Sequence, residues 1–131
     1  PLFRNPENVK FVNEAMYAVS NEYRGTAYTS RNTEKKYQYA GKTGTSQIKR
    51  ITEEQRELDL DVHEIPYKDR DHALFVAFAP YKNPRYAISV LIEHGGSGGK
   101  VAAPLAKKLI KVVIDRHKLR EKVRKERRTD I

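Results

Sequence analysis

The sequence contains no cysteine among its 131 residues. Disulfides, thiolate nucleophiles and thiolate metal sites are therefore excluded, and the composition is compatible with an oxidising compartment. The sequence also has no apolar run near the ~18 residues of a membrane span, and it has no signal-peptide pattern. If the protein is anchored or exported, we expect the responsible segment to lie outside this sequence.

There is no initiator methionine, since the chain opens on Pro1-Leu2, and this favours an excerpt from something longer. The length suits one ordinary domain. The net charge of +9 bears on partners and solubility rather than on the fold. Nucleic acid, an anionic membrane face and acidic cell-wall polymers are all compatible with this charge.

Helical periodicity starts at Asn5-Pro6, where Asn5 suits the N-cap and Pro6 suits the first helical position. The apolar positions that follow recur at steps of three and four residues, which predicts an amphipathic helix. These positions are Val9, Val12, Ala15, Met16, Val19 and Tyr23. Gly25 is expected to end the helix, and a polar, loop-like stretch follows over residues 26–36.

Three segments have the composition of strands. Tyrosines and threonines alternate over residues 37–45, which predicts a short first strand. Residues 73–79 form a short apolar run suited to a strand buried on both faces. A second apolar run covers residues 85–93, and the Pro-bounded turn at 80–84 predicts that the two runs pair as an antiparallel hairpin. The charged residues 47–71 are not assigned to an element.

The C-terminal part reads as a link followed by a helix. His94 to Gly99 have the composition of a flexible link, and a helix is expected from Lys100. Its apolar positions Val101, Leu105, Leu109 and Val112 are expected to pack on the sheet. Residues 118–128 are nearly all charged and are expected to form a solvated extension of this helix. The order of elements predicts an α+β layer with antiparallel neighbours.

The stretch Tyr39-Ala40-Gly41-Lys42-Thr43-Gly44-Thr45-Ser46-Gln47 admits two chemistries. A phosphate-binding P-loop, G-x-x-x-x-G-K-[ST], would need glycine at position 36, which is Lys36, and its lysine would open a long helix. The alternative is the Lys-Thr-Gly triplet of a serine acyl-transfer site. Such a site needs a fixed cation and hydroxyls to hold a substrate carboxylate, and a backbone N–H for the developing oxyanion. Glycine at position 44 lets the substrate backbone lie along the strand.

Four ordered blocks decide between the two chemistries. The first is G-K-T-G-T-S-Q over 41–47, and the second is Asp71-His72. The third is A-F-A-P-Y-K-N-P over 77–84, and the fourth is L-I-E-H-G-G over 91–96. This series resembles the C-terminal part of bacterial class B penicillin-binding proteins, in particular the penicillin-binding protein 2 group of the elongation (rod-shape) system. The resemblance runs from about residue 5 to about residue 114.

The resemblance implies a partial penicillin-binding transpeptidase (serine β-lactamase-like) domain, in which three antiparallel strands lie between an N-terminal and a C-terminal helix. Members of the family cross-link peptidoglycan: a serine attacks the D-Ala-D-Ala bond of a stem peptide, and β-lactams acylate the same serine. A parent protein on the periplasmic face of the inner membrane, anchored outside this chain, is implied. So is a membrane glycan polymerase as its partner. Residues 1–117 are then the transpeptidase part, and residues 118–131 are a charged tail.

By the same resemblance, Lys42, Thr43 and Gly44 are the catalytic motif. Lys42 supplies positive charge beside the substrate carboxylate and to the acid–base network. Thr43 is the middle residue of the motif. Thr45 binds the carboxylate through its hydroxyl and offers its N–H to the oxyanion.

The nucleophile is expected to be missing from this chain, which is therefore expected to be inactive alone. The family's S-x-x-K and S-x-N motifs lie far upstream of K-T-G. Three literal matches occur here at the wrong places: Ser46-Gln47-Ile48-Lys49, Ser97-Gly98-Gly99-Lys100 and Ser30-Arg31-Asn32. All three serines are expected to be polar loop residues, and Ser97 is expected to help start the last helix.

No metal or cofactor is expected, because the four histidines lack acidic partners at metal spacing. Of these, His72 and His94 flank the two core strands and are expected to pack or cap, whereas His63 and His117 are isolated. Two rival functions stay open. One is a small basic nucleic-acid-binding module using the C-terminal Lys/Arg run, although no nucleic acid is expected. The other is a small intact enzyme built on Ser97 and Lys100.

Overall fold

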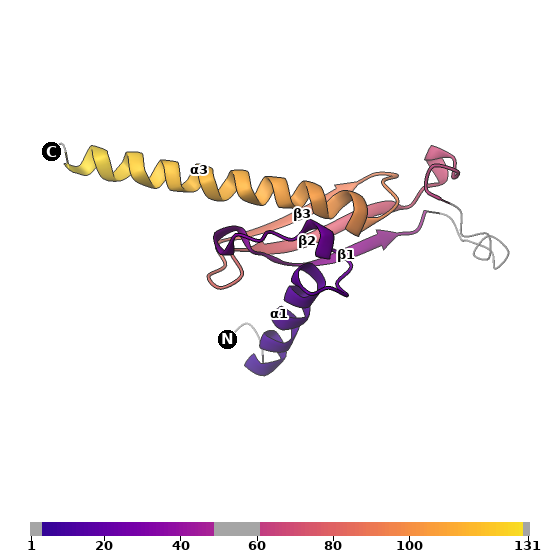
Figure 1. Cartoon of the computed structure of the whole chain (residues 1–131), viewed down its shortest axis with the longest axis horizontal. Helices are drawn as coiled ribbons and strands as arrows, with labels where there is room; N and C mark the ends of the chain where they lie inside the picture. The colour runs from indigo at the N-terminus through magenta and orange to yellow at the C-terminus, as the bar shows by residue number, and fades with distance from the viewer. Residues whose placement is uncertain (1–3, 49–60, 130–131) are drawn as a thin grey trace.

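The computed structural model describes residues 4–48 and 61–129 of the chain. Two helices and three strands make up most of it: α1 (Pro6–Asn21), β1 (Ala40–Ser46), β2 (His72–Ala79), β3 (Tyr86–Ile92) and α3 (Ala103–Thr129) (Figure 1). Shorter helical turns cover Tyr28–Ser30, Lys35–Tyr37, Tyr67–Asp69 and Gly98–Ala102. The predicted α+β class is confirmed.

The three strands form one antiparallel sheet in the order β1-β2-β3. Lys42 of β1 lies opposite Val76 of β2, and Val76 lies opposite Ser89 of β3. The predicted antiparallel hairpin of the two apolar runs is therefore confirmed, and the K-T-G strand lies beside one of them. In the part of the chain that the structure describes, β1 is an edge strand, paired only with β2.

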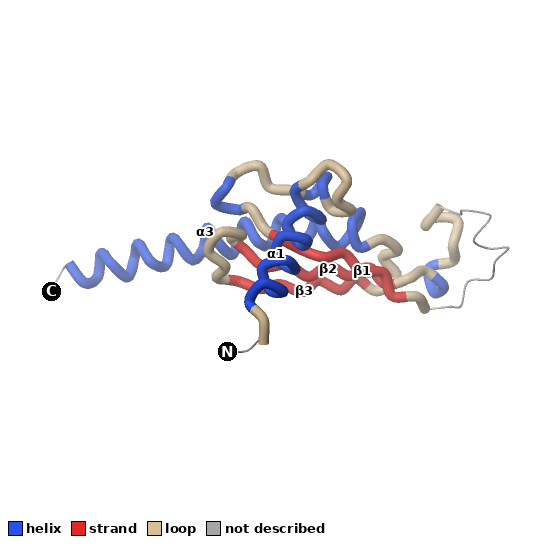
Figure 2. The backbone as a smooth tube through the Cα atoms, turned by 90° about the horizontal axis from the view of Figure 1, so that it is seen from below, coloured by secondary structure: helices blue, strands red, loops and turns tan. Residues whose placement is uncertain are grey.

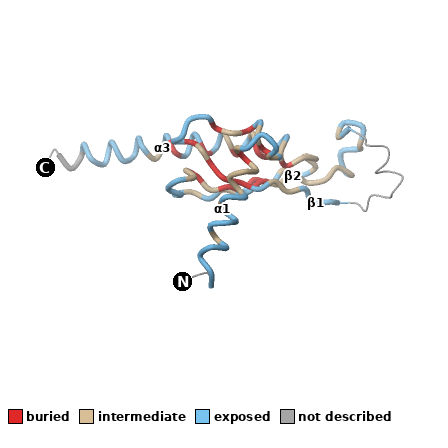
Figure 3. Tube along the Cα trace, turned by 60° about the horizontal axis from the view of Figure 1, so that its bottom comes forward, coloured by how far each residue is buried: buried red, intermediate tan, exposed pale blue. Residues whose placement is uncertain are grey.

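The two long helices lie on opposite sides of this sheet (Figures 1 and 2). Helix α3 runs along one face, and its first half closes the hydrophobic core over β2 and β3. Helix α1 meets the other side near the start of β1 and projects away from the sheet. There Tyr17 of α1 stacks on Tyr81, their ring centroids 4.4 Å apart. The core therefore lies between the sheet and α3 (Figure 3).

Helix α1 begins as predicted and ends earlier than predicted. The Asn5 side chain accepts a hydrogen bond from the N–H of Glu7 at 2.9 Å, and Pro6 occupies the first turn. The helix stops at Asn21, because Glu22 turns to an extended conformation. Gly25 instead permits close packing, since a Cβ there would lie 2.3 Å from the carbonyl oxygen of Val19.

Strand β1 starts at Ala40, three residues later than predicted. The two tyrosines that produced the alternating pattern, Tyr37 and Tyr39, lie before the strand and contact the core. Tyr37 belongs to a short 3₁₀ turn, and its hydroxyl donates to Asp115 of α3 at 2.5 Å. Tyr39 is fully buried, and its hydroxyl donates to the backbone oxygen of Ser30 at 2.7 Å. Both rings fasten the loop before β1 to the core.

The prediction that β2 is buried on both faces is wrong. Its burial alternates: Phe75 is fully buried, whereas Val76 is 44% exposed. The physical reason is that α3 covers only one face of the sheet. On the opposite side α1 contacts β1, and the face carrying Val76 and Leu91 leaves these two side chains exposed.

The prediction of which α3 side chains pack on the sheet is also wrong. The buried residues of this region are Ala102, Ala103, Ala106, Ile110 and Ile114. The predicted residues Val101, Leu105, Leu109 and Val112 are 39–60% exposed. Both sets have helical spacing, and they differ by about a third of a turn. The alanines bring the helix close to the sheet, and the larger side chains therefore face outward.

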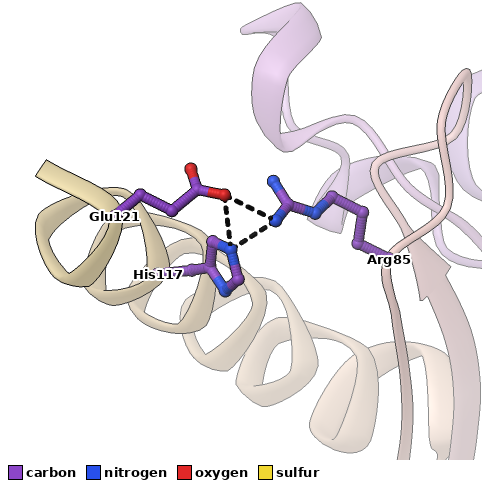
Figure 4. A network of polar contacts seen from close by, with 3 residues as sticks. All are labelled: Arg85, His117 and Glu121. Atoms are coloured by element: carbon purple, nitrogen blue, oxygen red, sulfur yellow. Dashed lines mark hydrogen bonds and ion pairs between the residues drawn. The ribbon is translucent and has the colours of Figure 1, made fainter. Parts of the chain in front are cut away.

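Beyond Ile114 the helix leaves the sheet, and its side chains over residues 115–126 are largely exposed (Figure 3). The predicted solvated extension is confirmed. It is tied to the β2–β3 turn by Arg85, His117 and Glu121 (Figure 4). The Glu121 carboxylate accepts from His117 at 3.0 Å and from Arg85 at 3.1 Å, and these bonds lower its pKa. Among the described residues, no helix has the length and apolar character needed to cross a membrane.

Candidate functional site

The K-T-G residues lie in the middle of the edge strand β1. Because side chains alternate along a strand, Lys42 and Gly44 share the open face of the sheet with their partners Val76 and Leu74. Thr43 lies on the α3 face, where its partner is Phe75. The motif therefore presents its cation on the face that α3 does not cover.

Lys42 is exposed, and its ammonium group lies against its own strand. Its Nζ donates to the backbone oxygen of Thr43 at 2.7 Å. Lys42 therefore has a positive charge beside an unpaired strand edge and is accessible to a ligand. This position on a strand, rather than at the start of a long helix, agrees with the rejection of a P-loop.

Thr43 is held by residues that sequence reasoning missed. Its hydroxyl lies 2.9 Å from the hydroxyl of Thr26, in the loop after α1. Its Cγ2 lies 3.6 Å from where a Cβ of Gly99 would be. The loop after α1 and the turn before α3 thus hold Thr43, the middle residue of the motif, from the α3 side of the sheet. The spacing of Thr26 and Gly99 in the sequence carries no signal for this contact, which arises only from the tertiary fold.

The two glycines that meet in this region have different surroundings. A Cβ on Gly98 would lie 2.3 Å from the backbone oxygen of Leu74 and 2.5 Å from that of Gly44, so the turn before α3 sits directly on the strands. A Cβ on Gly44 would meet only the Cβ of Leu74, at 3.4 Å. Gly98 is therefore needed for packing, whereas Gly44 keeps the open face free of bulk.

Thr45 is exposed near the end of β1, opposite Ala73. An edge strand leaves every second N–H and C=O without a partner in the sheet. Such an edge can accept an extended peptide as an additional strand, with main-chain hydrogen bonds supplying much of the affinity. By the same alternation Thr45 shares the α3 face with Thr43, so Lys42 and Thr45 flank the strand edge from opposite faces. A carboxylate-bearing ligand that meets both must therefore lie extended along that edge.

The strand end beyond Thr45 is bordered by a cluster of rings. His72 pairs with Ser46 across the sheet, and its Nδ1 accepts the backbone N–H of His94 at 2.9 Å. His94 has a left-handed backbone, with φ of 56°, and its own Nδ1 lies 3.1 Å from the backbone oxygen of Arg70. Tyr67 packs on His94, with ring centroids 4.7 Å apart. These contacts agree with the packing and capping roles predicted for His72 and His94.

The prediction that the three serines of the literal motif matches are polar loop residues is wrong for two of them, because Ser30 is buried in a 3₁₀ turn and Ser46 lies in β1. Ser30 is buried, and its backbone oxygen accepts the hydroxyl of Tyr39. Ser97 caps the turn before α3, its hydroxyl accepting the N–H of Lys100 at 3.4 Å, so the predicted capping role is confirmed. Ser46 is exposed at the end of β1, and Lys49 lies outside the described residues.

The described part of the chain holds no group of three or more His, Cys, Asp or Glu side chains that could bind a metal ion. Of the other two histidines, His63 is exposed, and His117 contacts Glu121 on α3. The chemistry that exposed Lys42 and the strand edge support is anion recognition along that edge.

Comparison with known proteins matches most of this chain to one family. A family model, the penicillin-binding protein transpeptidase domain, matches residues 4–111. The chain is 41% identical over 104 residues to peptidoglycan D,D-transpeptidase MrdA of Salmonella typhimurium, which is 79% of this chain and 16% of that protein. It is 48% identical over 71 residues to the MrdA protein of Acinetobacter baumannii, which is 54% of this chain and 10% of that protein.

Solved structures show the same fold. Penicillin-binding protein 2 of Helicobacter pylori in complex with MreC superposes with a TM-score of 0.66 and 34% identity, over 83% of this chain and 17% of that chain. Pseudomonas aeruginosa penicillin-binding protein 2 in complex with WCK 5153 gives 0.64 and 37%, over 84% and 20%. The chain thus spans about a fifth or less of the length of these relatives.

Proposed function

Because the chain belongs to the penicillin-binding protein transpeptidase family, we propose that it forms the K-T-G wall of a peptidoglycan D,D-transpeptidase site. The carrying observation is the position of Lys42, exposed on the open face of an edge strand that can take an extended substrate. The relatives named peptidoglycan D,D-transpeptidase supply the reaction class. The activity itself belongs to a longer protein, of which this segment is the C-terminal part.

The proposed reaction divides between this chain and the rest of the domain. A serine outside this segment attacks the carbonyl carbon of the D-Ala-D-Ala bond, and D-alanine leaves with the proton. The acyl group then passes from the serine to an amine of a neighbouring stem peptide, or a β-lactam traps the serine as a stable ester. Lys42 and the Thr45 hydroxyl hold the carboxylate of the donor, and the Thr45 N–H stabilises the oxyanion. Thr43, the middle residue of the motif, is held in place by its hydroxyl contact with Thr26.

The open face of the sheet supports an additional layer. Val76 and Leu91 are 44% and 58% exposed on the face that carries Lys42. Large apolar side chains grouped beside a functional cation favour burial against another element. We infer that the part of the domain bearing the nucleophile covers this face, so that the serine meets Lys42 at the strand edge. The chain alone is then inactive.

The proposed partners follow from the same assignment. Stem peptides and β-lactams occupy the strand edge, and a membrane glycan polymerase supplies the strands to be cross-linked. A site on the periplasmic face of the inner membrane, with a membrane anchor outside this chain, suits that substrate. One relative is solved in complex with MreC, and an MreC-like protein is therefore a further candidate partner. Residues 118–131 form the charged tail of the proposed domain.

A threonine substitution tests the assignment. In a protein that joins this segment to the family's S-x-x-K and S-x-N motifs, Thr45→Val keeps the shape of the side chain and removes its hydroxyl. Losing a hydrogen bond to a charged group costs about 1.5–3 kcal/mol, so acylation by a carboxylate-bearing β-lactam should slow about ten- to a hundredfold. Stopped-flow acylation kinetics measure this.

Thr29→Val is the matched control, because Thr29 is exposed in the loop after α1 and away from the motif. It should leave the acylation rate unchanged. An equal rate for the wild type and Thr45→Val would mean that Thr45 does not bind the carboxylate, and the proposed role would be withdrawn.

A further inference from the structure

A recess lies on the α3 side of the molecule, away from the face that carries Lys42. It is formed where the loop after Ser30 approaches the first half of α3, and its volume is about 290 Å³. The residues that line it are Arg31, Asn32, Thr33, Glu34, Lys107, Lys108 and Lys111. We call this the basic recess. The proposed transpeptidase role makes no use of it.

The basic recess has an excess of positive charge. Four of its side chains are cationic and one is acidic. That acid, Glu34, is already paired, because its Oε2 lies 3.3 Å from Nζ of Lys36. Across residues 4–48 and 61–129, no carboxylate forms an ion pair with the four cations of the recess. The recess is therefore suited to an anion from outside.

The walls of the basic recess are held in place from both sides. The Arg31 guanidinium lies 3.8 Å above the ring of Tyr28 and donates to the backbone oxygen of that residue at 3.1 Å. Asn32 is buried and donates to the backbone oxygen of Tyr37 at 3.0 Å. The Tyr37 hydroxyl in turn donates to Asp115, which ties the loop to α3. Little reorganisation is then needed when an anion enters.

The three lysines that α3 contributes to the basic recess form no ion pair in the part of the chain that the structure describes. Lys111 extends past the ring of Tyr37, with its Nζ 5.2 Å from the ring centroid. Lys107 and Lys111 are four residues apart, so they share one side of the helix, and Lys108 lies beside them. Like charges at this spacing destabilise a helix slightly, and an anion held between them removes that repulsion.

From this geometry we propose that the basic recess binds a phosphate-bearing anion. One guanidinium fork, three ammonium groups and the Thr33 hydroxyl supply more donors than the two oxygens of a carboxylate can accept. A phosphate offers three or more acceptor oxygens and up to two charges. The recess is also larger than a single phosphate group, which leaves room for a second phosphate or an ester substituent. A soluble diphosphate and a phospholipid headgroup share this chemistry.

Isothermal titration of the 131-residue chain with inorganic diphosphate tests the proposal. The triple variant Lys107→Gln, Lys108→Gln, Lys111→Gln should weaken binding by about tenfold or more, because three charge contacts are lost. The control triple Lys10→Gln, Lys68→Gln, Lys82→Gln removes the same charge from exposed lysines outside the recess. It should change the affinity less than about twofold. Circular dichroism confirms that both triples keep the fold. If the first triple does not, the single variant Lys108→Glu, at an exposed position, replaces it and should weaken binding in the same direction.

Vesicle sedimentation distinguishes the two sources of phosphate. Binding to phosphatidylglycerol vesicles, but not to phosphatidylcholine vesicles, that is lost in the recess triple identifies a lipid headgroup. Recess-dependent binding of diphosphate without vesicle binding identifies a soluble phosphate compound. Absence of binding to both diphosphate and phosphatidylglycerol would overturn the proposal. So would equal weakening by the two triples, because the effect would then reflect net charge alone.

Discussion

The two faces of the sheet differ in how they are covered. On the α3 face Phe75 is fully buried, and its ring meets that of Tyr39 edge-on with centroids 6.0 Å apart. On the opposite face its neighbour Val76 is 44% exposed beside Lys42. One face is closed by this chain's own helix α3, and the other carries Lys42 and leaves Val76 exposed among the described residues. The difference indicates that the closed face determines the fold, and it supports the proposal that another part of the transpeptidase domain covers the open face.

The largest expected effect is a difference in the free energy of unfolding between substitutions on the two faces. Phe75→Ala removes a fully buried ring from the closed face and should lower the free energy of unfolding by about 3–5 kcal/mol. Val76→Ala, on the open face, should lower it by less than about 1 kcal/mol. Urea denaturation of the chain followed by circular dichroism measures both. Equal losses would mean that the two faces are buried alike, and the comparison would fail.

A pair of glycines sharpens the comparison at the motif. Gly98→Ala places a methyl group 2.3 Å from the backbone oxygen of Leu74, so the turn before α3 must shift, at a cost of about 1–3 kcal/mol. Gly44→Ala meets only a side-chain carbon at 3.4 Å and should cost less than about 1 kcal/mol. Thermal unfolding of the two variants tests this order. The reverse order would show that the turn does not pack on the strands as described.

Alkaline pH gives a smaller effect, confined to the closed face. Burial raises the pKa of the Tyr39 hydroxyl from 10.0 to about 12. The folded state therefore holds this proton more tightly than the unfolded state does. The resulting stabilisation is fully present below pH 10.0 and is lost as the pH rises through about 12. Tyr39→Phe should flatten this decline in denaturation curves, whereas Tyr23→Phe, at an 86% exposed position, should not. A decline that persists unchanged in Tyr39→Phe would assign it to another group.

Sequence reasoning predicted the elements that local patterns encode. The cap at Asn5, the antiparallel hairpin and the solvated end of α3 all follow from spacing and turn residues. The resemblance of four ordered blocks identified the family. These features depend on residues close together in the chain.

The predictions that were wrong or missing concern features that tertiary packing determines. Leu105 and Ala106 are adjacent on α3, and hydrophobicity favours the leucine as the buried residue, yet the small alanine is buried because the helix lies close to the sheet. The tyrosine–threonine alternation that suggested a strand from Tyr37 reflects two rings anchored in the core. Likewise, the contact between Thr26 and Thr43 joins residues 17 positions apart and has no local signal.

Intact mass spectrometry after incubation with fluorescent penicillin tests the central claim most directly. The claim is that this chain supplies the K-T-G wall and that the nucleophile lies elsewhere in the domain. Lys42 and Thr45 alone cannot form an ester, so the 131-residue chain should show no mass increase at concentrations that label a protein containing all three family motifs. A stoichiometric adduct that maps to Ser30, Ser46 or Ser97 would contradict the claim and would make this chain a small enzyme in its own right.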